Sequence, residues 1–179
     1  LALVAPALGS AAAPAKTLIH CGAVIDGESG RAAGESTIIV SDGRIEALRE
    51  GRAIAGEGDT EVELGGSTCM PGLMDMHLHL TSEQSPNRSI DRFRKDPADY
   101  AYASVPYARR TLMAGFTTVR DLGSSHNLGI ALRNAINAGH IVGPRIFAAG
   151  KSLATTGGHA DPTNGRNMAL RGDPGPKEG

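Results

Sequence analysis

The sequence of 179 residues predicts an α/β fold built from two parts. Residues 17–70 contain short apolar runs on both sides of Asp42 and Gly43, a pair typical of two-residue hairpin turns, and predict a small β domain. From residue 71 onward, strand-length apolar runs alternate with segments of helical periodicity. A β-α-β-α-β order predicts three parallel strands with the connecting helices on one side of the sheet, because such crossovers are right-handed.

The N-terminal stretch, LALVAPALGSAAAPA, carries no charge. Its apolar run passes into small residues with A-x-A spacing, which is typical of the end of an export signal. Residues 1–16 therefore predict either a signal-peptide remnant or a disordered Ala-rich arm. The run is too short, and too interrupted by Pro and Gly, to span a bilayer. A trimmed signal indicates a periplasmic or secreted protein, with a cytoplasmic location as the alternative.

The β domain is expected to be a small antiparallel unit of the β-sandwich type. Its first strand is TLIHCGAVID, the hairpin around Asp42 follows, and a weaker strand covers residues 61–64. The only two cysteines, Cys21 and Cys69, flank this region. They are too few for a disulfide framework, so one bridge and two reduced thiols both remain open.

The second part, residues 71–179, begins with the strand-length run GLMDMHLHL. Asp96 and Pro97 supply an N-cap and a first-turn proline for a helix in which Pro106 predicts a kink. A second helix has apolar residues at i, i+3, i+4, i+7 and i+8 and ends before Gly139. The expected elements are strands over 72–80, 116–121 and 145–149, helices over 96–115 and 128–138, and loops over 81–95 and 160–179.

The charge balance limits the possible partners. Lys and Arg number 18 and Asp and Glu number 19, which gives a formal net charge of −1. Without a basic surplus to displace counterions from phosphates, we expect no nucleic-acid partner. A small-molecule or dipeptide substrate is the expected partner, and the sequence leaves the oligomeric state open.

Two histidines near the end of the first strand of the second part are the main candidate for chemistry. Residues two apart on a strand point to the same face, so Asp75, His77 and His79 are expected to share one face. Two neighbouring imidazoles can converge on one metal ion. The spacing alone is also compatible with a pair of partly exposed histidines at a strand end.

Three strings carry a family resemblance: CMPGLMDMHLHL, GFTTVRDLG and GPRIFAAGKSLATTGGHAD. They resemble the first three strands of the amidohydrolase superfamily, whose entry motif is P-G-[LF]-[IVM]-D-x-H-x-H, and within it the imidazolonepropionase-like branch that includes Xaa-Pro dipeptidases. The resemblance covers residues 17–161. It implies the first three βα units of a TIM (β/α)8 barrel, an incomplete barrel, and hence the N-terminal fragment of a longer hydrolase.

The resemblance also implies roles for individual residues. His77 and His79 would bind the more buried metal, usually Zn²⁺, with two ions in the complete enzyme and other divalent metals possible. His159, in the loop TTGGHAD, would contact substrate, and Asp75 would support a ligating histidine. The other metal ligands and the catalytic acid or base have no counterpart here, so no catalytic residue is assigned.

Five further polar residues are expected to have ordinary roles. His20, His126 and His140 are expected to be solvated or hydrogen-bonded histidines. Arg120 and Asp121 end a strand and point to opposite faces, so at most one faces the pocket, and an ion pair or a turn cap is expected.

By this resemblance, the parent protein hydrolyses amide C–N bonds with a metal-activated hydroxide. A dipeptidase of the Xaa-Pro type is expected, and the chain alone is expected to be inactive. The alternatives are a cyclic-amide hydrolase of the imidazolonepropionase or hydantoinase kind, and a non-catalytic binding fragment.

Overall fold

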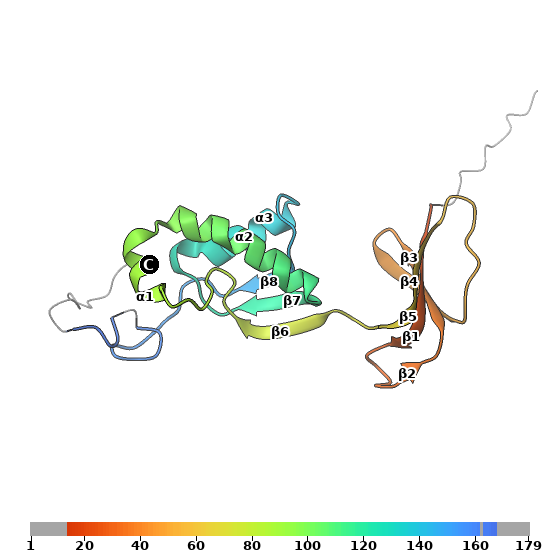
Figure 1. The fold of residues 1–179 in the computed structure, drawn as a ribbon, viewed down its shortest axis with the longest axis horizontal. Coiled ribbons are helices and arrows are strands. Elements are labelled where there is room, and N and C mark those ends of the chain that lie inside the picture. Colours follow the sequence, from red (N-terminus) through yellow and green to blue (C-terminus); the bar gives the residue numbers. More distant parts are fainter. Residues whose placement is uncertain (1–13, 162, 168–179) are drawn as a thin grey trace, which may run out of the picture. The chain divides into compact units, whose positions relative to one another are not determined.

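The computed structural model describes residues 14–161 and 163–167, and it divides into two compact units between Pro71 and Gly72 (Figure 1). The predicted N-terminal signal or arm lies outside the described residues, apart from residues 14–16. The same holds for Pro162 and residues 168–179 of the predicted C-terminal loop. In the part of the chain that is described, no helix has the length and apolar character needed to cross a membrane.

The first unit is one five-stranded sheet with β1 at its centre. Strand β3 pairs antiparallel with β1 and β4, and Asp42 and Gly43 between β3 and β4 both have positive φ, as the predicted hairpin turn requires. The strands are β1 (Thr17–Ile25), β2 (Ala32–Ala33), β3 (Ser36–Ser41), β4 (Arg44–Glu50) and β5 (Thr60–Cys69).

Two expectations for this unit are wrong. Strand β5 is ten residues long and pairs parallel with β1, so the sheet is mixed and not antiparallel. The described strands of the unit also form a single sheet and not a sandwich. The reason is the connection over residues 51–59, which crosses from β4 at one edge and brings β5 beside the free edge of β1, as parallel pairing requires.

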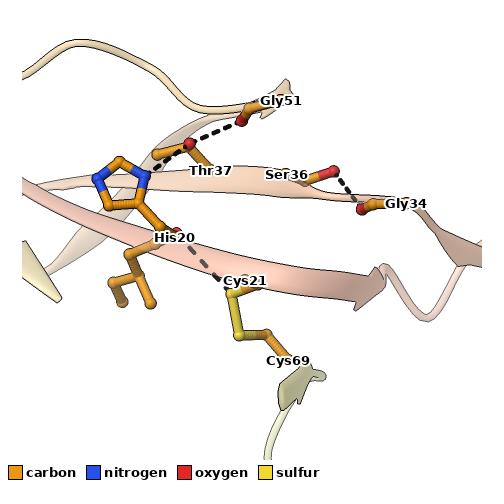
Figure 2. The surroundings of a disulfide bond; sticks show 8 residues. His20, Cys21, Gly34, Ser36, Thr37, Gly51 and Cys69 are labelled. Atoms are coloured by element: carbon orange, nitrogen blue, oxygen red, sulfur yellow. Dashed lines mark hydrogen bonds between the residues drawn. A yellow bond between two sulfur atoms is a disulfide. The ribbon is translucent and has the colours of Figure 1, made fainter. Parts of the chain in front are cut away.

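Strands β1 and β5 are also joined covalently (Figure 2). Cys21 and Cys69 form a disulfide with a Cα–Cα distance of 5.9 Å, and Cys21 is fully buried. The sequence leaves open whether the two cysteines form a bridge or stay reduced, and the structure contains the bridge.

The second unit contains a three-stranded parallel sheet in the order β6-β7-β8. Helices α2 and α3 lie on the same side of it (Figure 1), so the predicted β-α-β-α-β order with parallel strands is confirmed. The elements are β6 (Leu73–Leu78), α1 (Arg88–Arg94), α2 (Pro97–Met113), β7 (Phe116–Asp121), a 3-10 turn (Ser125–Asn127), α3 (Leu128–Asn137) and β8 (Arg145–Ala148).

The predicted start of α2 at Asp96 and Pro97 is confirmed, whereas the kink expected at Pro106 stays a prediction. The backbone N–H of Asp96 donates to Asp99 Oδ2 at 2.8 Å at the start of α2, and the helix continues through Pro106. The apolar faces of α2 and α3 meet the sheet in one core, which consists of Leu80, Ala108, Val119, Leu132 and Ile146. Leu80, which directly follows His79 in the sequence, belongs to this core.

One expectation for this unit is wrong as well. The predicted loop over 81–95 contains the short helix α1. Its last turn is supported by an ion pair from Lys95 Nζ to Asp91 Oδ2 at 2.7 Å, four residues apart on one helix face. The segment 81–95 is largely polar, which hides the helical period of its sequence, and the apolar side chains Ile90 and Phe93 of α1 are exposed.

Candidate functional site

His77 and His79 lie at the carboxyl end of β6, where the loops of a parallel sheet begin. The centroids of the two imidazole rings are 5.9 Å apart, and their planes are inclined by 75°. Both residues are exposed, so an incoming ion or substrate can reach both rings. The structure therefore brings together the two histidines that the spacing predicts as neighbours.

The ring of His79 is fixed by a backbone contact. Its Nδ1 lies 2.8 Å from the carbonyl oxygen of Gly123, in the turn that follows β7. Because a carbonyl oxygen can only accept, Nδ1 must carry the proton. The lone pair of the neutral ring is then on Nε2, which is free of this contact and able to bind a metal ion.

Asp75 supports the backbone in this structure. Its Oδ1 accepts a hydrogen bond of 2.9 Å from the backbone N–H of His77, and the residue is half-buried. The sequence suggests a carboxylate acceptor for the ring of a ligating histidine, whereas the acceptor for His79 is the main-chain carbonyl of Gly123 in the turn after β7. Such an acceptor has no residue-type signature, so sequence reasoning could not find it.

Arg120 and Asp121 point to opposite faces of β7, as expected. Arg120 Nε donates to the carbonyl oxygen of Met76 at 2.6 Å. Asp121 is buried and caps the following turn by accepting the backbone N–H of Gly123 at 3.1 Å. Of the two expected roles, the turn cap is the observed one for Asp121.

His159 lies in the loop after β8 and is exposed. This loop is shaped by its neighbours, since Asp161 Oδ2 accepts the backbone N–H of Gly157 at 2.7 Å. Within the described residues, His159 forms no ring contact or hydrogen bond with the histidine pair of β6. His126 and His140 are exposed, in agreement with ordinary roles.

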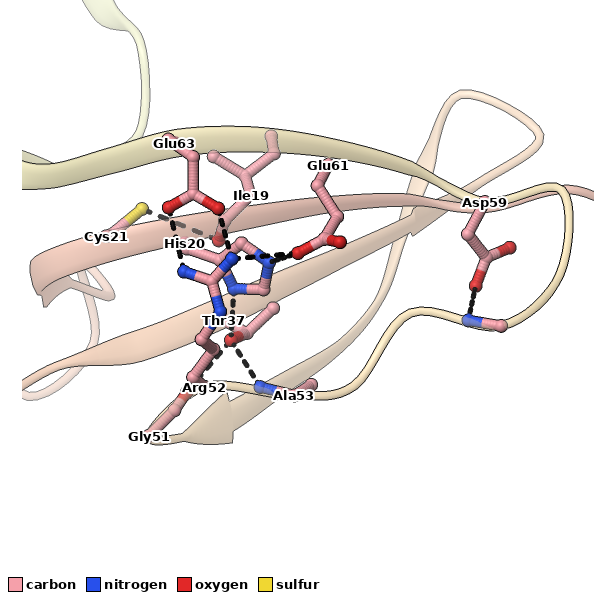
Figure 3. A network of polar contacts seen from close by, with 11 residues as sticks. Ile19, His20, Cys21, Thr37, Gly51, Arg52, Ala53, Asp59, Glu61 and Glu63 are labelled. Carbon is pink, nitrogen blue, oxygen red and sulfur yellow. Dashed lines mark hydrogen bonds and ion pairs between the residues drawn. The ribbon is translucent and has the colours of Figure 1, made fainter.

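A second cluster lies in the first unit and was not expected from the sequence as a ligand group (Figure 3). One ligand atom each from His20, Glu61 and Glu63 lies within 4.8 Å of the others, a spacing that could hold a metal ion. However, the guanidinium of Arg52 donates to Glu61 Oε2 at 2.9 Å and to Glu63 Oε2 at 2.8 Å. The hydrogen bond from Arg52 lowers the pKa of Glu63 below its usual value. A cation therefore already balances these carboxylates.

The buried member of that cluster, His20, is held at both ring nitrogens. Nε2 lies 2.9 Å from Glu61 Oε2, and Nδ1 lies 3.0 Å from Thr37 Oγ1. Figure 3 shows that the same hydroxyl also donates to the carbonyl of Gly51 and accepts the N–H of Ala53, at 2.8 and 2.9 Å. His20 is thus a hydrogen-bonded core histidine, as expected, and the hydroxyl of Thr37 is the hub that fastens the residue 51–59 connection to the sheet.

Replacing this hub is expected to be costly. Thr37 is fully buried, so Thr37→Val keeps the shape of the side chain but leaves the Ala53 N–H and the Gly51 carbonyl without their partner. We expect the free energy of unfolding to fall by about 2 kcal/mol in urea titrations. Thr60→Val, at an exposed position of β5, is the matched control and should change it by less than about 0.5 kcal/mol. Equal effects of the two substitutions would contradict the hub role.

The chain is similar to known proteins of one family. The model of the amidohydrolase family matches residues 68–177. The chain is similar to ochratoxinase from Aspergillus niger, at 29% identity over 154 residues, which cover 81% of this chain and 30% of that protein. Among solved structures it is similar to a Xaa-Pro dipeptidase with bound methionine in the active site, with a TM-score of 0.78 and 41% identity over 87% of this chain and 38% of that chain.

A second solved structure gives the same picture. It is a prolidase complexed with N-methylphosphonate-L-proline, with a TM-score of 0.68 and 31% identity over 80% of this chain and 34% of that chain. The chain thus spans about a third of the length of the relatives that it matches. Since the family model covers well over half of the 179 residues and includes both His77 and His79, the chain belongs to the amidohydrolase family.

Proposed function

We propose that this chain supplies two metal ligands, His77 and His79, to a metal-dependent hydrolase that cleaves amide C–N bonds. Amidohydrolases are metal-dependent enzymes. The observation that carries the proposal is the contact from His79 Nδ1 to the Gly123 carbonyl, which leaves Nε2 as the lone-pair donor beside the His77 ring.

The donor set fits a borderline-soft ion such as Zn²⁺, for which neutral imidazole nitrogen is a preferred ligand. A catalytic zinc needs three protein ligands. Among the described residues, His77 and His79 belong to no group of three ligand atoms within reach of one ion. We therefore propose that the complete site draws further ligands from outside these residues, and that the 179-residue chain alone binds Zn²⁺ weakly and hydrolyses no substrate.

When bound, a divalent ion at this position acidifies water and polarises an amide carbonyl. The chain's own residues hold the ligands: Asp75 fixes the backbone of His77, and Gly123 fixes the ring of His79. His159 is proposed as a substrate contact from the loop after β8. Similarity to a Xaa-Pro dipeptidase and to a prolidase supports a dipeptide as the substrate class.

We also propose an oxidising location, in the periplasm or outside the cell. The Cys21–Cys69 disulfide supports it, because such bridges persist in exported proteins and are rare where thiols are kept reduced.

The test is a titration of the 179-residue chain with Zn²⁺, followed through the imidazole resonances in NMR spectra. We expect weak binding that shifts His77 and His79 and is lost in the double variant His77→Asn/His79→Asn. His140→Asn, at an exposed position of the same unit, is the matched control and should bind as the wild type does. His20→Asn separates this site from the cluster of the first unit and should leave the shifts of His77 and His79 unchanged.

Two outcomes would overturn the proposal. Zinc binding that survives the double replacement would remove His77 and His79 as ligands. Tight stoichiometric zinc, together with turnover of Xaa-Pro dipeptides by this chain alone, would contradict the need for ligands from elsewhere.

A further inference from the structure

We propose that Asp121 is a positioning residue: its carboxylate holds the ring of His79 in the orientation that presents Nε2. It acts through the backbone of Gly123 and Leu80 and touches neither metal nor substrate. The functional meaning of this role depends on the proposed function of His79 as a ligand.

The carboxylate bridges the two backbone segments that determine where the His79 ring lies. Asp121 Oδ1 accepts the N–H of Gly123 at 3.1 Å, and Oδ2 accepts the N–H of Leu80 at 3.2 Å. Gly123 provides the carbonyl that accepts His79 Nδ1–H, and Leu80 follows His79 directly in the chain. Asp121 therefore contacts the His79 region from two sides. One contact runs through Gly123, whose carbonyl binds the His79 ring, and the other runs through the N–H of Leu80, the next residue after His79.

Burial makes these contacts effective. Only 1% of Asp121 is exposed, so both backbone N–H groups depend on this carboxylate. Hydrogen bonds to an ionised acceptor are about twice as strong as those between neutral groups, and more so away from water. Losing one oxygen would leave a backbone donor without its acceptor and would loosen Gly123, whose carbonyl lies in the next peptide unit and accepts His79 Nδ1–H.

The turn around Gly123 is also braced by its surroundings. The N–H of Leu122 donates to the carbonyl of Leu78 at 3.1 Å, and the N–H of Ser124 donates to the carbonyl of Gly150 at 2.9 Å. Gly123 has a φ of +156°, which residues with a side chain rarely adopt, and a Cβ atom there would also lie 2.2 Å from Ser152 Oγ. The turn is thus tied to both neighbouring strands. The Gly150 carbonyl holds the peptide unit that contains the Gly123 carbonyl, and Asp121 holds the preceding unit through the Gly123 N–H.

This role explains a buried carboxylate that the hydrolytic chemistry itself does not use. A histidine that binds a metal through Nε2 needs its other nitrogen fixed as a donor, because a ring that turns or changes tautomer presents the wrong atom. A carbonyl that is itself held in place supplies that constraint before any ion arrives.

The experiment compares wild type, Asp121→Asn and Ser104→Ala as ¹⁵N-labelled 179-residue chains. Long-range ¹H–¹⁵N spectra report the tautomer of His79 without metal, and titration with Zn²⁺ alone reports affinity at the same ring. We expect a single Nδ1–H tautomer in the wild type. In Asp121→Asn we expect a mixture of tautomers and zinc binding that is weaker by about tenfold to a hundredfold.

Ser104→Ala is the matched control. It also removes one buried side-chain hydrogen bond in the same unit, at 2.6 Å to the carbonyl of Ala101, but that bond lies within α2. It should leave both the tautomer and the zinc affinity of His79 unchanged, so a general loosening of the unit is distinguished from a loss of positioning.

Each outcome decides one of the two proposals. If Asp121→Asn keeps the wild-type tautomer and zinc affinity, the positioning role is overturned, while His79 can still be a ligand. If the tautomer is released in Asp121→Asn but the wild type shows no response to zinc, the ligand assignment fails and the positioning stands. Should Asp121→Asn not fold, Gly123→Ala strains the same turn because of its φ of +156°, and an unchanged His79 tautomer there would overturn the role of this turn, and with it that of Asp121.

Discussion

Removing the disulfide between Cys21 and Cys69 is expected to lower the free energy of unfolding of the first unit by about 4 kcal/mol. The bridge closes a loop with a sequence separation of 48 residues and joins the first strand of the sheet to the last. In the unfolded chain this closure removes many conformations, and the open chain recovers them when the bridge is absent. A small sheet with few fully buried apolar side chains has little other energy to offset such a loss.

The measurement is amide hydrogen exchange in β1 and β5 of Cys21→Ala/Cys69→Ala, because residues 1–71 contain no Phe, Tyr or Trp to report on the unit. Alanine is chosen because Cys21 is fully buried and alanine adds no polar group there. The internal control is the wild type in reductant, which should approach the stability of the variant. Equal protection of the oxidised and reduced wild type would show that the bridge contributes nothing.

The parallel sheet of the second unit was predictable because its signals are local. Asp96 and Pro97 begin α2, and the sequence FTTVRD forms β7 with the expected bounds. Handedness then fixes the order of the strands, so no long-range information is needed. The pairing of His77 with His79 was predictable for another local reason: side chains two residues apart on a strand point to the same face.

The first unit was predicted less well because strand partners are a long-range property. Residues 17–26 and 61–64 read as strands, but no local pattern states that β5 lies parallel to β1. The glycines Gly65 and Gly66 interrupt the apolar pattern and hide the second half of β5. They belong to a bulge in β5, where residues 65–67 lie opposite the single residue Gly22 of β1, and a Cβ on Gly22 would lie 2.1 Å from the Gly65 carbonyl oxygen.

The supporting shell of the candidate site shows a second limit. A sequence displays side chains, whereas the ring of His79 is held by a main-chain carbonyl and Asp121 binds two main-chain N–H groups. The expected turn cap at Asp121 gave the right kind of contact. Its connection to His79 depends on the contacts between the segments after β6 and β7, which are far apart in the sequence and have no local sequence pattern.

Leu132→Ala is expected to lower the free energy of unfolding of the second unit by about 3 kcal/mol. Leu132 is 4% exposed and packs from α3 into the core with Val119 and Ile146. Truncation leaves a cavity between a helix and a sheet that are both held by other contacts, so the site collapses only in part. The three tyrosines, Tyr100, Tyr102 and Tyr107, all lie in α2, and their fluorescence reports this unfolding in urea.

Leu153→Ala makes the same chemical change at a side chain that is 99% exposed, and it should alter the free energy of unfolding by less than about 0.5 kcal/mol. The core and the site share one residue, because Leu80 packs in this cluster while its N–H donates to Asp121. Loosening the core should therefore also speed amide exchange at Leu80, which adjoins His79. If Leu132→Ala costs no more than Leu153→Ala, or leaves the exchange of Leu80 unchanged, then the core does not hold the strand end that carries the histidines.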